Sequence, residues 1–81
     1  MISCEAHDCI EIVCMYRYRV RLTLGSGSEL EGVALDTGRN KNREECITIS
    51  DGDADNLVVL DSITKMEALV ENPHFKIVNF K

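Results

Sequence analysis

The sequence predicts an α+β fold that is mainly β: one N-terminal helix at about residues 4–15, then a small barrel or sandwich of five to seven antiparallel strands at about residues 16–80. Apolar residues before Tyr16 recur with the spacing of a helix, whereas those after it alternate with a period of two, as in a half-buried strand. Further short apolar runs follow at close spacing. A chain of 81 residues has room for one modest core, so residues 1–81 are predicted to form a single domain.

The predicted helix has two distinct faces. On a helical wheel of about 100° per residue, the small and apolar side chains form one stripe, made of Ala6, Cys9, Ile10, Val13 and Cys14. The opposite face carries Glu5, Asp8, Glu11, Ile12 and Met15. Ser3 is a candidate N-cap, and acidic residues in the first turn suit the helix dipole. We therefore expect the stripe to pack on the strands and the acidic face to meet solvent.

The first two strands are predicted to form a hairpin. Residues 16–24 alternate, with Tyr18, Val20, Leu22 and Leu24 on one side and Arg17, Arg19, Arg21 and Thr23 on the other. The arginines are expected on the exposed side, paired with neighbouring carboxylates, and the sequence assigns them no function. Gly-Ser-Gly-Ser at residues 25–28 provides the turn into a second strand, Glu29 to Asp36, in which Gly32 indicates a bulge or a sharp bend.

The rest of the chain predicts short strands separated by polar turns. Residues 37–45 are polar and predict an exposed loop. The elements expected after it are strands at residues 46–49 and 56–60 around an acidic turn at 51–55, a bent or bulged strand at 62–70, a turn at 71–74 and a last strand at 75–80. Strands this short in so small a domain favour a barrel, which removes exposed sheet edges.

The cysteine spacing raises the question of a metal or redox site, and the helix argues against one. Side chains five residues apart differ by about 140° around a helix, so Cys4, Cys9 and Cys14 cannot converge on one ion. His7 is about two turns from Cys14, and a thiol facing the core is poorly placed to attack a substrate with His7 as its base. Cys46 stands alone on a strand. We therefore predict reduced, buried thiols, no metal, no cofactor and no catalytic residue.

The acidic turn resembles the start of a calcium loop only in part. Asp51, Asp53 and Asp55 have the spacing of the first calcium ligands, but Ser62 stands where the glutamate of such a loop is required. An acidic hairpin turn is the favoured interpretation.

The charge balance favours a basic partner over nucleic acid. Acidic side chains number 14 against 9 basic ones, for a net charge of −5, whereas nucleic-acid binding depends largely on Lys and Arg neutralising phosphate.

No apolar run approaches the roughly 18 residues that a membrane span needs. Met1 leads into the domain without the pattern of a secretory signal. We therefore expect a cytoplasmic protein that is a monomer when free and has no membrane partner.

The acidic helix face has two competing interpretations. Acids on an exposed face usually serve only solvation. However, Ile12 and Met15 lie among Glu5, Asp8 and Glu11, which makes a small patch with apolar anchors inside a charged rim. Such a patch is suited to a basic partner, which the acids would attract and select.

Four segments of the chain, residues 2–14, 20–36, 41–49 and 57–65, carry a family resemblance. Their most specific parts are the pattern Cys4…Asp8…Glu11…Cys14, the segment Lys41-Asn42-x-Glu44 and the segment Leu60-Asp61-x-Ile63. Together they resemble the Rho-binding antiterminator family, Rof, also called YaeO, over nearly the whole chain, from Ile2 to about Val78.

The resemblance implies a fold and a function. The fold is a short N-terminal helix packed on a small Sm-like, or SH3-like, β-barrel. The function is inhibition of Rho-dependent transcription termination, by binding the N-terminal, RNA-recognising domain of the hexameric factor Rho and hindering its loading on transcripts. The resemblance assigns the helix contacts to His7, Asp8 and Glu11 and the loop contacts to Lys41 and Asn42. His7 departs from the tyrosine of a relative.

The main alternative is an Sm-like protein that itself binds RNA. Residues 20–36 are similar to the first Sm motif, with a glycine-centred turn and an aspartate. After Asp36 the pattern departs, because Thr37-Gly38 follows in place of the base-binding asparagine and no Arg-Gly pair appears near the last strands. A small enzyme is a third possibility, with no catalytic constellation in its favour.

Overall fold

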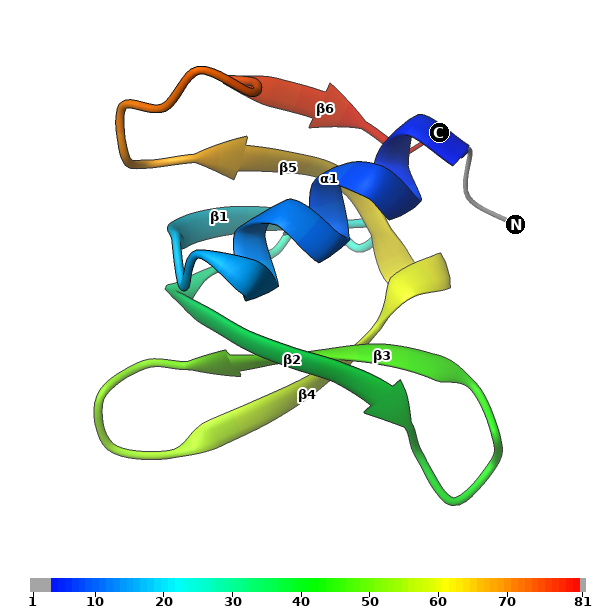
Figure 1. Ribbon diagram of the computed structural model, residues 1–81. Coiled ribbons are helices and arrows are strands. Elements are labelled where there is room, and N and C mark those ends of the chain that lie inside the picture. Colours follow the sequence, from blue (N-terminus) through cyan, green and yellow to red (C-terminus); the bar gives the residue numbers. More distant parts are fainter. Residues whose placement is uncertain (1–3, 81) are drawn as a thin grey trace.

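One helix lies against a strongly bent antiparallel sheet in the computed structural model, which describes residues 4–80 (Figure 1). The elements are, in chain order, α1 (Cys4–Met15), β1 (Arg19–Leu24), β2 (Glu29–Arg39), β3 (Glu45–Ser50), β4 (Asp55–Val59), the 3₁₀ helix η1 (Leu60–Ser62), β5 (Ile63–Ala68) and β6 (Ile77–Asn79). Neighbouring strands are antiparallel and follow the order β4-β3-β2-β1-β5-β6. The predicted fold class, mainly β with one N-terminal helix, is confirmed.

The sheet is open, whereas we expected closure into a barrel without edges. β4 and β6 end the strand order, and no pairing within residues 4–80 joins them. In Figure 1, α1 lies in front of the bent sheet, with β5 and β6 above it and β3 and β4 below it. Ala6 and Val13 of the helix are fully buried, and α1 contacts both β2 and β6. The helix therefore covers the core on one side of the open sheet.

The helix and both halves of the sheet share one core. The predicted helical stripe is confirmed, since Ala6, Cys9, Ile10 and Val13 are buried and Cys14 is half-buried. From the sheet and η1, the buried apolar side chains include Val20, Leu22, Ala34, Ile47, Ile49, Leu60, Ile63 and Met66. On the other helix face Glu5, Asp8, Glu11 and Met15 are exposed and Ile12 is half-buried. The candidate N-cap Ser3 lies outside the described residues.

β1 begins later than predicted because the end of the helix requires a turn. The backbone N–H of Tyr18 donates to the carbonyl of Val13 at 3.0 Å, and Arg17 has a φ of 55°. Arg17 therefore belongs to this turn and not to the strand. The predicted alternation holds for the remainder, with Val20 and Leu22 buried and Leu24 packed against the core.

β2 continues through residues that we predicted to be a loop. Thr37, Gly38 and Arg39 pair with β3, so the exposed loop is confined to residues 40–44. Residues 36–39 are all exposed, and a strand with both faces in solvent has no period-two signal.

The expected irregularity in β2 lies at Leu35 and not at Gly32. Gly32 pairs in regular register with Val20, whereas the register with β3 shifts between Ala34 and Asp36. A Cβ atom at Gly32 would collide with the carbonyl oxygen of Ser50. The glycine is therefore required where β3 crosses closely over the bend in β2.

The C-terminal third follows the predicted order with altered bounds. The bent segment 62–70 divides into the end of η1 and β5, with a register shift against β1 between Thr23 and Leu24. The last strand shortens to residues 77–79, because only these pair with β5.

The acidic turn is confirmed: the Asp51 carboxylate accepts the N–H groups of Asp53 and Ala54, each at 3.0 Å, and these bonds lower the pKa of Asp51. Within residues 4–80, no helix is long and apolar enough to cross a membrane.

Candidate functional site

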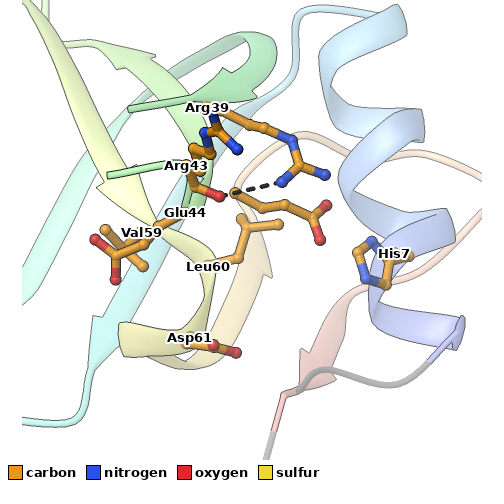
Figure 2. A pocket seen from close by; sticks show the side chains of 8 residues that line it. His7, Arg39, Arg43, Glu44, Val59, Leu60 and Asp61 are labelled. Atoms are coloured by element: carbon orange, nitrogen blue, oxygen red, sulfur yellow. Dashed lines mark hydrogen bonds between the residues drawn. The ribbon is translucent and has the colours of Figure 1, made fainter. Parts of the chain in front are cut away.

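Two adjoining hollows form a groove between α1 and the β2–β3 hairpin. Figure 2 shows one of them, the hollow that Asp61 lines. His7, Arg39, Glu45 and Leu60 line both hollows, Glu11 lines one and Asp61 the other. We call this surface, defined by these six residues, the helix–hairpin groove. Its floor includes the apolar side chain of Leu60, and its walls carry both acidic and basic groups. In Figure 2, the His7 side chain points from the helix toward the hairpin, and Asp61 of η1 lies below the hairpin residues.

The acidic helix face borders this groove. His7 and Glu11 line the groove, while Glu5 and Asp8 are exposed outside it. None of the three acids, Glu5, Asp8 and Glu11, forms an ion pair within the described residues. Their charges are therefore available to a partner.

The apolar members of the helix face differ in exposure. Met15, at the end of α1, is 70% exposed, whereas Ile12 is less exposed because it is half-buried. Tyr16, which follows Met15, is 52% exposed and stacks on Tyr18 and His74, with ring centroids 5.5 and 5.6 Å apart. Met15 is thus the apolar side chain most available to a partner on this face.

The hairpin loop holds the predicted loop residues, Lys41 and Asn42, next to residues that line the groove. Residues 40–44 connect β2 to β3, and the stem of that connection, at Arg39 and Glu45, lines the groove. Lys41 and Asn42 are exposed in the loop but do not line the groove itself. The two segments that the sequence suggested separately, the helix and this loop, therefore border one surface.

Four residues that line the groove were not among the predicted site residues: Arg39, Glu45, Leu60 and Asp61. A signal for two of them was present, because Leu60 and Asp61 belong to one of the three specific segments of the family resemblance. Another such segment ends at Glu44, which also lines one hollow. Segments separated in sequence but specific to one family therefore meet at one place in the structure.

The β1 arginines lie apart from this site. Arg21 forms ion pairs with Glu31 of β2 at 2.9 Å and with Glu67 of β5 at 3.1 Å. This arrangement confirms the expected pairing for Arg21 and joins three neighbouring strands. Because the pairs are partly exposed to solvent, their contribution to stability is small.

All four cysteines are free thiols. Cys9 and Cys46 are buried and Cys14 is half-buried, as expected, but Cys4 is exposed. Burial, with a smaller contribution from the charge of Asp36, raises the pKa of the Cys14 thiol to about 11, so this group is neutral at pH 7. Among the described residues, no cluster of three His, Cys, Asp or Glu side chains is arranged to hold a metal ion.

Fold and site together define a small, mainly β domain with an exposed acidic helix face beside an open groove, features typical of a regulatory binding protein. The chain belongs to the family of modulators of Rho-dependent transcription termination, ROF, whose family model matches residues 1–80. It is similar to the solved structure of YaeO bound to magnesium from Vibrio cholerae O395, with 42% sequence identity and a TM-score of 0.88 over 91% of this chain and 96% of that one. No relative was found among curated proteins. The resemblance inferred from the sequence is confirmed.

Proposed function

We propose that this protein binds the N-terminal, RNA-recognising domain of Rho and blocks the loading of RNA, so that termination fails. The contact is made by the acidic helix face, with Asp8 and Glu11 at its centre, and by Lys41 and Asn42 of the hairpin loop. The observation that carries the proposal is that the three helix acids are exposed and form no ion pair within residues 4–80, and that Glu11 lines the same groove as the stem of the hairpin.

The electrostatics support competition with RNA. A surface that binds RNA presents Lys and Arg to phosphate groups, and carboxylates form similar charge-assisted hydrogen bonds with the same side chains. Asp8 and Glu11 are three residues apart on α1, so they lie on one face about one turn apart. They can therefore occupy neighbouring basic groups that otherwise hold phosphate.

The remaining helix residues have supporting roles in this proposal. Glu5 adds charge at the start of α1, and His7 extends the contact into the groove. Met15, with its large exposed fraction, and Ile12 provide apolar contact beside the acids. The protein acts as a cytoplasmic monomer, without a cofactor and without contacting nucleic acid itself.

The test is binding to intact Rho and to its isolated N-terminal domain, measured by pull-down and by titration. Asp8→Lys and Glu11→Lys are each expected to weaken binding roughly tenfold or more, because each replaces an attraction with a repulsion. Asp53→Lys is the matched control. It makes the same charge change on the exposed turn at the other end of β3 from the hairpin loop, and binding should be retained.

Two results would contradict the proposal. If the unmodified protein does not bind Rho, the function is wrong. If both helix reversals bind as well as the Asp53→Lys control, the helix face is not the contact surface.

A further inference from the structure

A single side chain organises the hairpin loop at residues 40–44. The carboxamide oxygen of Asn40 accepts the backbone N–H of Asn42 at 2.9 Å and that of Glu44 at 3.0 Å. Its amide nitrogen donates to the Glu44 carboxylate at 3.1 Å. One carboxamide therefore holds the backbone at two positions of the loop and a side chain at its end.

The loop backbone is closed by further bonds around Asn40. The N–H of Asn40 donates to the carbonyl of Glu44 at 3.1 Å, and the N–H of Arg43 donates to the carbonyl of Asn40 at 2.9 Å. Arg43 adopts a φ of 65°, a left-handed conformation that is unfavourable for a residue with a side chain. The Arg39 guanidinium donates to the Arg43 carbonyl at 3.1 Å, as the dashed line in Figure 2 shows, and the loop is held in this shape.

Lys41 and Asn42 differ from these residues. Both are exposed, and within residues 4–80 neither side chain forms a hydrogen bond or an ion pair. The polar side chains of Asn40, Glu44 and Arg39 are thus used to shape the loop, while those of Lys41 and Asn42 are left available to a partner.

We infer that Asn40 is a positioning residue for partner binding. This inference rests on the function proposed above. Its carboxamide preforms the loop so that Lys41 and Asn42 are presented in their bound arrangement. A loop ordered before binding loses less conformational freedom when the complex forms, so affinity is higher than for a loop that must be ordered at that moment.

The test compares Asn40→Ala with Asn40→Asp. Alanine removes all three carboxamide bonds, and Asn40→Ala should weaken binding to the Rho N-terminal domain roughly tenfold. Aspartate keeps an oxygen for the two backbone N–H groups, so Asn40→Asp should bind more tightly than Asn40→Ala, although it replaces the bond to Glu44 with a repulsion between two carboxylates. Asn56→Ala is the control, because it removes a side-chain amide from the β4 side of the acidic turn, and it should leave binding unchanged.

A double-mutant cycle separates positioning from a general loss of stability. Lys41→Ala should weaken binding in the unmodified protein but much less in the Asn40→Ala background, because Lys41 is then no longer held in place. Amide hydrogen exchange should accelerate at Asn42 and Glu44 in Asn40→Ala, while the β1 amides keep their protection.

The outcomes distinguish this inference from the proposed function. If Lys41→Ala weakens binding and Asn40→Ala does not, the inference is overturned and the loop contact stands. Additive effects in the cycle, or unchanged exchange at Asn42 and Glu44, also overturn it. If Lys41→Ala and Asn42→Ala both bind normally, the loop contact itself is wrong, and the role of Asn40 is wrong with it.

Discussion

At the scale of single residues, Gly32 shows how a missing side chain permits the bend in the sheet. β2 pairs with β1 up to Val33 and with β3 from Val33 onward, so the strand changes partner beside this glycine. A Cβ atom there would meet the Ser50 carbonyl and the Ile49 side chain, both of which belong to β3. The position accepts only a hydrogen atom because another backbone lies against it.

We expect Gly32→Ala to destabilise the protein by about 1–3 kcal/mol, since the added methyl group forces two packed strands apart. Urea denaturation measures the change. Gly38→Ala is the matched control in the same strand, because a Cβ atom at Gly38 meets nothing within 4 Å. That variant should stay within about 0.5 kcal/mol of the unmodified protein. Equal stability of the two variants would show that the close approach at Gly32 is not limiting.

At the scale of elements, α1 has separable structural and binding faces. Ile10 is 1% exposed in the core, whereas Met15 is 70% exposed on the same helix. The helical wheel predicted this division from spacing alone, because the 3.6-residue period places a side chain on a face without reference to the rest of the fold.

Ile10→Ala is expected to lower the free energy of unfolding by about 2–5 kcal/mol, through lost burial and the cavity that remains. Thermal unfolding should show a correspondingly lower midpoint. Met15→Ala should leave the midpoint nearly unchanged and weaken only Rho binding, because its side chain lies in solvent. A large loss of stability in Met15→Ala would mean that this side chain packs in the folded protein.

The β2–β3 hairpin was the element least accessible to prediction. Its outer part, Asp36–Arg39, is exposed on both faces, so it lacks the alternation that marks a half-buried strand. The pairing partner in β3 decides that these residues are a strand. The same pairing places Arg39 and Glu45, which both line the groove, opposite each other.

At the scale of the whole molecule, the net charge of −5 should govern association with a basic partner. We expect affinity for the Rho N-terminal domain to fall as salt rises from about 0.05 M to about 0.5 M, since the screening length shortens over that range. Titration at several ionic strengths measures this dependence. The Asp8→Lys, Glu11→Lys double variant should show a smaller slope. Affinity independent of salt would indicate an interface dominated by Ile12 and Met15.

The helix with its two faces, most of the strands, the family and the candidate residues on α1 and in the hairpin loop could be predicted from the sequence alone. These follow from local periodicity, turn residues and short family-specific segments. Three features became visible only in the folded molecule: the sheet is open, β2 bends where β3 crosses Gly32, and Arg39, Glu45 and Asp61 line one groove with His7. These features depend on which distant segments pair and pack together. A short stretch of sequence does not reveal which distant segment it will pair with.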